Sequence, residues 1–305
     1  MPEGHSIHRL ARQFDDVFAG QRLAVSSPQG RFADGAALLD GRSLLSARAH
    51  GKQLFLGFEG GLVLRVHLGF YGAWDFGGDE TFRGASSIGA PRRVGERELV
   101  DDGAGSASAV PPPPVGAVRA RLVSEHGWAD LRGASVCTVE TEAEAAAVVA
   151  RLGPDPLAQN PGEGAEGAGE EFARRIGRRR TPLSRLLMDQ EVVSGIGNVY
   201  RAELLFRARL DPALPGSGLG RERAVALWED AAEAMAEGVR DGRIITTDPS
   251  HWPDGPAALP APQDAHYVYR RQGQPCRECG ESVALAAEAG RKLYWCPACQ
   301  RSSAQ

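Results

Sequence analysis

The first residues of the chain, Met1-Pro2-Glu3-Gly4, carry groups that could perform covalent chemistry. Met1 is usually removed before a small residue, and Pro2 would then be the N-terminal residue with a free secondary amine. An α-amine titrates at about pH 8, so a usable fraction can attack an electrophilic carbon and form an iminium ion. Glu3 places a carboxyl group beside this nucleophile for proton transfer. Many proteins begin Met-Pro without any catalytic role. The rest of the chain must therefore show whether Pro2 is a nucleophile.

Lysine is the second unusual feature, because the chain has only Lys52 and Lys292 while its other 33 basic residues are arginine. A lysine can release its proton when its site lowers its pKa, whereas arginine cannot do so near neutral pH. The two lysines are therefore candidates for chemistry.

Four of the five cysteines form two Cys-x-x-Cys pairs near the C-terminus: Cys276, Cys279, Cys296 and Cys299. The pairs are separated by 16 residues, which is the spacing of a four-cysteine zinc site with a β-hairpin between the pairs. A redox dithiol is the alternative, and two matched pairs argue against it. Four thiolates fill the coordination sphere of one zinc ion, so we expect a structural site with no open position for catalysis.

A glycine-rich turn, Gly195-Ile196-Gly197-Asn198, interrupts a helical pattern. Asn198 is suited to cap the helix that follows, and turn glycines before a helix N-terminus expose backbone N–H groups that bind phosphate. An ordinary helix–turn–helix corner is the alternative, because Gly-x-Gly alone is weak evidence.

Positive charge is concentrated in one segment of the chain and is not a property of the whole chain. The whole chain has a net charge of −4, which gives no global case for nucleic acid. Between residues 172 and 210, nine arginines stand against Asp189, Glu191 and Glu203, a local charge of +6 (9 − 3). Such a patch can neutralise DNA phosphates, although a solvated helix face is the alternative for any one arginine.

The first 150 residues are expected to be β-rich. Residues 7–18 have helical periodicity, with Ile7, Leu10, Ala11 and Phe14 on one face. Short strand patterns with turn signals follow and indicate a sandwich or barrel: residues 22–25, 43–50, 53–59, 62–67, 71–76 and 118–124. Residues 101–114 are predicted to be an exposed loop, residues 142–151 a helix, and Cys137 a buried small hydrophobe.

The second half is expected to be helical. Residues 160–169 are rich in Gly and Glu and predict a flexible linker. Helical patterns then cover residues 171–176, 183–188, 199–207 and 220–241. No apolar run approaches the roughly 20 residues of a membrane span, and no signal peptide is evident, so we expect a cytoplasmic protein with no membrane partner.

Taken together, five segments identify a family. They occur in this order: Pro-Glu-Gly at the start, His50-Gly51-Lys52, Gly153-Pro154-Asp155-Pro156-Leu157, the turn from Gly195 to Glu203, and the cysteine pairs. The chain resembles the formamidopyrimidine-DNA glycosylase/endonuclease VIII family of base-excision repair enzymes over nearly its whole length. The resemblance implies an α+β protein with an N-terminal two-layer β-sandwich with flanking helices (residues 1–152), a helix–two-turns–helix domain with its linker (153–261) and a C-terminal β-hairpin zinc finger (262–305).

The resemblance also implies roles for particular residues. Pro2 would attack C1′ of the damaged nucleotide to form a Schiff base, and Glu3 would protonate the opening sugar. Lys52 matches the strand lysine that contacts DNA phosphate and assists β-elimination. Asn198 matches the turn asparagine that binds phosphate, and Arg291 matches the finger arginine that grips the phosphate near the lesion and is associated with δ-elimination. Surface charge is the alternative for Lys52 and Arg291.

A base inside a duplex is out of reach, so such an enzyme must flip it out and fill the void with wedge side chains. Phe70 and Tyr71 stand where related enzymes carry the wedge, in the segment that begins at His67, and all three are expected to contact DNA. Burial in the sandwich core is the alternative for the two aromatic residues. One structural zinc ion is expected, with no redox cofactor and no catalytic metal.

Two features favour the endonuclease VIII branch and oxidised pyrimidines as substrates. The start is Pro-Glu-Gly rather than Pro-Glu-Leu, and Leu131-Arg132-Gly133 replaces a longer wedge segment of the 8-oxoguanine branch. His5-Ser6 and the small Gly69 depart from the family pattern, and a small wedge with a long linker would suit bubble or single-stranded DNA besides duplex. The alternatives are a glycosylase for 8-oxoguanine and formamidopyrimidine, or a non-catalytic DNA-binding protein on the same fold. We expect a monomer that acts on damaged DNA at the nucleoid.

Overall fold

A computed structural model describes residues 2–90, 110–158 and 165–301 of the chain. The chain divides into two compact units, Met1–Arg151 and Leu152–Gln305. Residues 101–109 of the predicted loop and 160–164 of the predicted linker lie outside the described residues. The boundaries of the three predicted domains stay a prediction. None of the helices in the described ranges is long and apolar enough to span a membrane.

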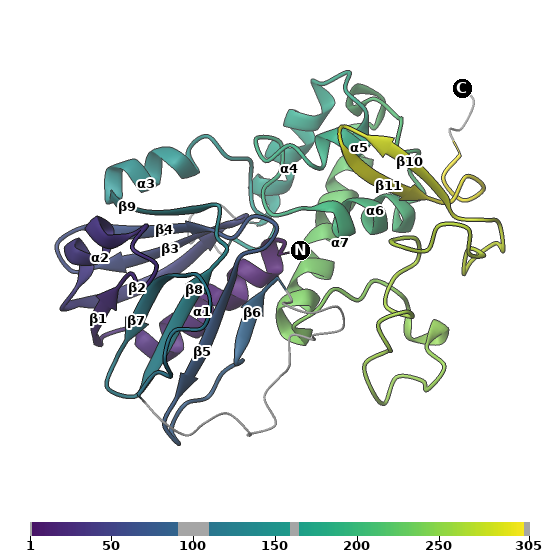
Figure 1. Cartoon of the computed structure of the whole chain (residues 1–305). Helices are drawn as coiled ribbons and strands as arrows, with labels where there is room; N and C mark the ends of the chain where they lie inside the picture. The colour runs from purple at the N-terminus through teal and green to yellow at the C-terminus, as the bar shows by residue number, and fades with distance from the viewer. Residues whose placement is uncertain (1, 91–109, 159–164, 302–305) are drawn as a thin grey trace. The chain divides into compact units, whose positions relative to one another are not determined.

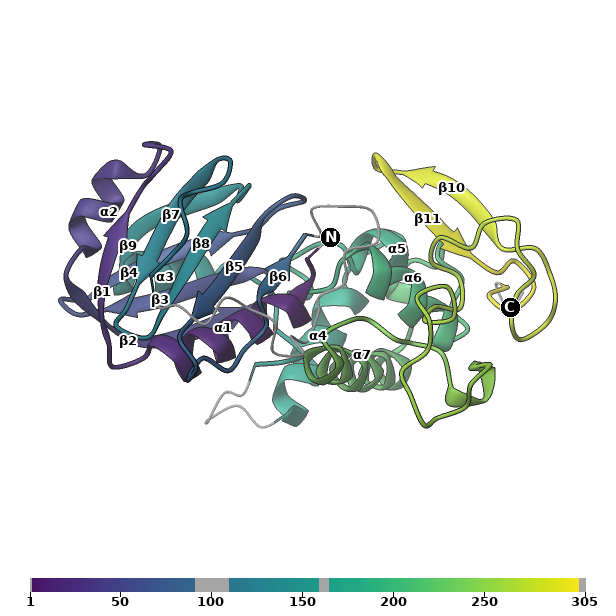
Figure 2. The same ribbon diagram turned by 60° about the horizontal axis from the view of Figure 1, so that its bottom comes forward.

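A nine-stranded antiparallel sheet forms most of the first unit, in the order β6-β5-β8-β7-β1-β2-β3-β4-β9. Its strands are β1 (Arg22–Ser26), β2 (Arg42–His50), β3 (Gln53–Phe58), β4 (Leu62–His67), β5 (Ala73–Gly78), β6 (Ser87–Gly89), β7 (Val118–Val123), β8 (Gly127–Arg132) and β9 (Val136–Thr141). The first residues of β1 pair with β2 and its last three pair with β7. The sheet therefore folds over at β1 into the two layers visible in Figures 1 and 2, which confirms the predicted sandwich.

Alternating side chains of both layers fill one core, as a strand period of two requires. Helix α1 (Gly4–Phe18) closes it with the apolar face predicted from the sequence, although the helix begins three residues earlier than predicted. The Phe14 ring lies 4.8 Å from the Trp74 ring and 5.2 Å from the Phe76 ring of β5. These ring contacts attach α1 to the layer that contains β5. They fix the position of the helix, and with it the position of the helix N-terminus within the first unit.

Several elements of the first unit escaped prediction: α2 (Ala33–Leu39), β6, β8 and β9. Strand β8 carries Asp130, which is buried in an ion pair with Arg121 at 2.7 Å, so its charges hide the strand pattern. Strand β9 lies at the sheet edge without regular alternation of burial. Cys137 on β9 packs against the core as predicted, but it is partly rather than completely buried. Helix α3 (Glu142–Val149) was predicted and begins with a capping box between Thr141 and Glu144.

The second unit begins with helices that pack around one apolar core. They are α4 (Ala165–Gly177), α5 (Leu183–Leu186), α6 (Asn198–Arg207) and α7 (Arg221–Asp241), with short 3₁₀ turns at Gly216–Gly218 and Pro249–His251. Helix α4 begins at Ala165, so the predicted linker is wrong for residues 165–169. Gly169 allows α4 to pack closely on α7, because a Cβ at this position would be only 3.0 Å from the Trp228 indole.

The predicted hairpin between the cysteine pairs is present as β10 (Ala284–Glu288) and β11 (Arg291–Trp295). Its strands pair from Ala284↔Trp295 to Glu288↔Arg291. A small core of buried side chains, including Phe206 of α6 and Tyr294 of β11, joins the hairpin to the helices within this unit.

Candidate active site

Pro2 and Glu3 lie buried where α1 begins. Glu3 occupies the position before the first helical residue, and its carbonyl oxygen accepts a hydrogen bond from Ser6 N–H at 3.0 Å. A carboxylate at this end of a helix is favoured by the helix dipole. The neighbouring His5 ring is also buried, and burial, with Arg9 as the next cause, lowers its pKa to about 3. The two residues that precede α1 are therefore the amine and carboxyl candidates, and the neutral imidazole of His5 lies in the first turn that follows them.

Lys52 and His67 lie together at one end of the β2–β3–β4 strands. Lys52 is in the two-residue turn between His50 and Gln53, which pair across the hairpin, and so it is not on a strand as the resemblance implied. His67 ends β4 directly opposite Gln53. Burial lowers the pKa of His67, and the positive charges of Lys52 and Arg65 lower it further. The imidazole is thus neutral at physiological pH beside a lysine.

The predicted wedge residues follow directly after His67. Phe70 is 54% exposed and Tyr71 is 85% exposed, so the alternative that they are buried in the sandwich core is wrong. Their turn is closed by a hydrogen bond of 3.0 Å from Gly72 N–H to the Leu68 carbonyl oxygen. Two aromatic side chains on a closed turn form an exposed apolar projection.

In the second unit, the turn before α6 is fastened to the segment that begins at Gly153. Gly153 N–H donates to the Gln190 carbonyl oxygen at 2.7 Å, and Ser194 N–H donates to the Pro154 carbonyl oxygen at 2.9 Å. A side chain at Gly153 would meet the Val192 backbone at 2.5 Å. The segment that begins at Gly153 therefore packs directly against the turn, with no space for a side chain at residue 153.

Asn198 does not cap α6, which corrects the sequence prediction: the capping position is Gly197, and no side-chain cap bond is formed. The Asn198 amide instead donates to the Lys292 carbonyl oxygen at 3.0 Å, next to Arg291 at the start of β11. The buried Arg201 guanidinium donates to both the Asn198 side-chain oxygen and the Lys292 carbonyl oxygen. Within the second unit, the structure thus brings Asn198 and the residues around Arg291 together.

The basic patch is smaller than its composition suggests. Arg174 and Arg175 pair with Glu171, Arg207 pairs with Asp230, and Arg209 pairs with Glu278. Residues 178–180, all arginine, are exposed between α4 and α5, and no ion pair of their side chains is found in the described part of the chain. The charges of these three exposed arginines are therefore not neutralised by an ion pair among the described residues.

Glu203 is an important residue to which the sequence analysis assigned no role of its own, although it counted Glu203 as a charge and as the end of a family segment. Its buried carboxylate accepts hydrogen bonds from Tyr267 N–H (2.7 Å), Val268 N–H (2.9 Å) and Tyr269 N–H (2.7 Å) and from the Thr246 hydroxyl. These bonds hold the chain that leads into the finger against α6. A glutamate among the apolar residues Ala202, Leu204 and Leu205 of α6 was the signal that could have revealed it.

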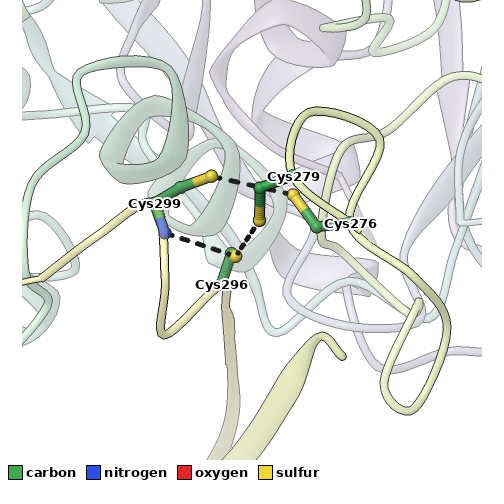
Figure 3. Close-up of side chains that lie close together, drawn as sticks. All are labelled: Cys276, Cys279, Cys296 and Cys299. Atoms are coloured by element: carbon green, nitrogen blue, oxygen red, sulfur yellow. Dashed lines mark hydrogen bonds between the residues drawn. The ribbon is translucent and has the colours of Figure 1, made fainter. Parts of the chain in front are cut away.

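The four cysteines gather in one cluster (Figure 3), as predicted. Their sulfur atoms all lie within 4.8 Å of one another, with 3.9 Å between Cys276 and Cys299 and 3.5 Å between Cys279 and Cys296. Tetrahedral zinc with Zn–S bonds of about 2.3 Å requires S–S distances of roughly 3.8 Å, so the donor set fits one zinc ion. All four positions are filled by the chain, which makes the site structural.

Three family descriptions match successive parts of the chain. "Formamidopyrimidine-DNA glycosylase N-terminal domain" matches residues 1–127, "Formamidopyrimidine-DNA glycosylase H2TH domain" matches residues 152–250, and "Zinc finger found in FPG and IleRS" matches residues 273–301. The zinc-finger match covers the four cysteines and the hairpin between them.

Whole-chain relatives agree with these matches. The chain is 44% identical to "Endonuclease 8 1" of Mycobacterium bovis over 300 residues, which cover 98% of this chain and 100% of the relative. It is 31% identical to the "Formamidopyrimidine-DNA glycosylase" of Thermus thermophilus, with 98% of each chain covered. The crystal structure of MutM (FPG) from Thermus thermophilus superimposes with a TM-score of 0.66 over 98% of both chains at 30% identity. The Lactococcus lactis Fpg structure with DNA containing N7-benzyl-Fapy-dG gives a TM-score of 0.72 at 17% identity, covering 99% of this chain and 100% of that one, a likeness of fold alone. The chain therefore belongs to the formamidopyrimidine-DNA glycosylase/endonuclease VIII family, in its endonuclease VIII-like branch.

Proposed function

We propose that this protein removes oxidised pyrimidines from DNA through a Schiff base at Pro2 and then cuts the strand by β,δ-elimination. Membership of the family makes the chain a DNA glycosylase of base excision repair with AP-lyase activity. The proposal extends to the residues that act and to the class of base that is removed. It also places the protein in the cytoplasm at the nucleoid, where its DNA substrate is.

The covalent step uses Pro2 and Glu3, the two residues that precede α1. The Pro2 nitrogen lone pair forms a bond to C1′ as the glycosidic bond breaks with its electron pair leaving on the base, and the N–H proton that Pro2 loses neutralises the departing base. Glu3 gives its proton to the sugar ring oxygen, so the ring opens to an iminium ion at C1′. The iminium makes a C2′ proton acidic; its loss expels the 3′ phosphate, and a second elimination expels the 5′ phosphate. Water then releases Pro2 as the free amine.

The remaining candidates hold the DNA. Lys52 and His67 would contact phosphate in the first unit, and Lys52 would assist β-elimination. Asn198 and Arg291 would bind phosphate in the second unit, and Arg291 would promote δ-elimination. Phe70 and Tyr71 would enter the stack when the damaged base is flipped out. Zinc supplies no reaction step; its four thiolate ligands would hold the hairpin that carries Arg291.

The preference for pyrimidines rests on the branch. Identity to "Endonuclease 8 1" is 44%, against 31% to the Thermus thermophilus "Formamidopyrimidine-DNA glycosylase". The short connection that begins at Gly133 between β8 and β9 has no room for the longer wedge segment of the 8-oxoguanine branch. Matched duplexes with thymine glycol or 8-oxoguanine at the same position test this preference. Faster cleavage of the 8-oxoguanine duplex would reverse the assignment.

The observation that carries the chemistry is the burial of Pro2 and Glu3 together at the N-terminus of α1. The test is borohydride trapping on an oligonucleotide with one abasic site, after mass spectrometry has verified that Met1 is removed. We expect a covalent adduct with the wild-type protein, much less adduct with Pro2→Gly, whose terminal amine is primary and less nucleophilic, and slower base excision with Glu3→Gln. If the processed wild-type protein gives no adduct, Pro2 is not the nucleophile.

A further inference from the structure

Ser135, the residue before β9, contacts His67 at three points. Ser135 N–H donates to the His67 carbonyl oxygen at 2.9 Å. The Ser135 hydroxyl lies 2.9 Å from the same oxygen and 2.8 Å from His67 Nδ1. Sequence reasoning assigned no role to Ser135, which is 68 residues from His67 along the chain.

The same imidazole nitrogen holds the wedge turn. Gly69 N–H donates to His67 Nδ1 at 3.2 Å, so Nδ1 is an acceptor and the proton of the neutral ring is on Nε2. The single Ser135 hydroxyl proton is then shared between Nδ1 at 2.8 Å and the His67 carbonyl oxygen at 2.9 Å. The lowered pKa of His67, caused by burial and then by Lys52 and Arg65, agrees with a neutral ring. Ser135 therefore orients the ring whose Nδ1 accepts the first backbone donor of the turn.

Ser135 also lies directly beneath the turn. Gly69 has a positive φ of 66°, and a Cβ built there would be 3.0 Å from the Ser135 oxygen. On the other side, a Cβ on Gly133 would be 2.6 Å from the Tyr71 carbonyl oxygen. The connection between β8 and β9 is thus in close contact with both ends of the turn that carries Phe70 and Tyr71.

We propose that Ser135 is a positioning residue for DNA flipping: with His67 it forms a latch, defined as the Ser135–His67–Gly69 hydrogen bonds, that fixes the turn bearing Phe70 and Tyr71. This inference rests on the proposed function. A wedge that is already fixed loses little conformational freedom when it enters the base stack, so more of its contact energy is available to open the duplex.

A latch of this kind predicts a selective defect. A duplex has a stack to open, whereas a single strand with the same lesion leaves no void beside a partner strand. Ser135→Ala should therefore slow cleavage of a damaged duplex by about fivefold, the effect of one hydrogen bond, and leave the single-stranded substrate almost unchanged. A purely structural loss would slow both substrates together.

The experiment compares single-turnover cleavage of a thymine-glycol oligonucleotide as duplex and as single strand. The variants are Ser135→Ala, the double variant Phe70→Ala/Tyr71→Ala, and the triple variant that combines them. Thr138→Ala, an exposed position on the same strand β9, is the matched control and should behave as wild type. Because the latch acts through the wedge, Ser135→Ala should add no further loss once both aromatic side chains are removed.

A second readout needs no chemistry. 2-Aminopurine placed opposite a tetrahydrofuran abasic analogue in a duplex should brighten when the wild-type protein opens the stack, and Ser135→Ala should reduce that rise at saturating protein. Equal slowing of both cleavage substrates, additive loss in the triple variant, or an unchanged 2-aminopurine signal would overturn the latch. Absence of a trapped Pro2 adduct would instead overturn the proposed chemistry, and the fluorescence arm would still test the latch.

Discussion

The Asn198 side-chain amide donates a hydrogen bond of 3.0 Å to the backbone carbonyl oxygen of Lys292. A residue of the two-turn motif and a residue of the finger hairpin are thus joined directly, beside Arg291. Since the Arg201 guanidinium donates to both partners, the phosphate candidates of the second unit are fixed relative to one another.

Asn198→Ala removes this connection and one phosphate donor, so we expect DNA affinity to fall by about tenfold, equal to roughly 1.4 kcal/mol. Binding to a duplex with an abasic analogue, measured by fluorescence anisotropy, gives the value. Asn198→Asp keeps an oxygen for Arg201 but no donor for Lys292. It should bind no better than Asn198→Ala; wild-type affinity in the aspartate variant would show that the amide donor is unimportant.

Acid should destabilise the first unit through His5. The pKa of His5 is lowered from 6.5 to about 3, chiefly by burial and then by Arg9, so the unfolded chain binds a proton that the folded chain does not. The free energy of unfolding should therefore fall as pH drops below 6.5, by up to about 1.4 kcal/mol per pH unit. Urea denaturation at pH 7.0, 6.0 and 5.0 measures this slope. His5→Gln should show a flatter dependence, and an unchanged slope in that variant would exclude His5 as the cause.

The three arginines at residues 178–180 should set part of the salt dependence of DNA binding. Changing all three to glutamine should reduce the slope of log K against log salt concentration by about 0.9 for each phosphate that the variant no longer neutralises. Anisotropy titrations at several salt concentrations supply the slope. Arg240→Gln is the control, because Arg240 already pairs with Glu237 and Asp241 on α7. Equal slopes in the triple variant and the wild type would leave residues 178–180 as a solvated surface.

Cys296→Ser should release zinc and abolish tight DNA binding while the first unit stays folded. Cys296 is fully buried at the centre of the finger, so a serine there leaves three thiolates and a poor fourth ligand. Mass spectrometry of the zinc content checks the release of zinc, and far-ultraviolet circular dichroism checks that the first unit stays folded. Global unfolding on loss of zinc would contradict the separation of the sandwich from the finger.

The sequence predicted correctly those features that depend on residues close together along the chain. The cysteine spacing predicted the metal cluster and its hairpin, and the periodicity of residues 7–18 predicted the buried face of α1. Most strands of the first unit followed from alternation of apolar residues. The residue types suggested the amine and proton-transfer chemistry of Pro2 and Glu3, whereas their targets in DNA and the role of Arg291 came from the family resemblance; all of these roles stay predictions.

The sequence failed where a residue's partner is distant. Asp130 and Arg121 neutralise each other across two strands, so β8 did not look like a buried strand. Asn198 looked like a helix cap because its partner, Lys292, is 94 residues away. Ser135 gave no signal at all, since its contact with His67 depends on the pairing of β4 with β9.

Glu203 has a consequence for the exchange of parts between relatives. The backbone N–H groups of Tyr267, Val268 and Tyr269 are satisfied by a carboxylate on α6, outside the finger itself. A finger transplanted onto a helix without a glutamate at this position would leave three donors without this acceptor, two of them in buried hydrogen bonds. The zinc finger of this protein therefore depends on α6 for these hydrogen bonds. A chimera that exchanges the finger must carry α6 with it, and the two must be exchanged together.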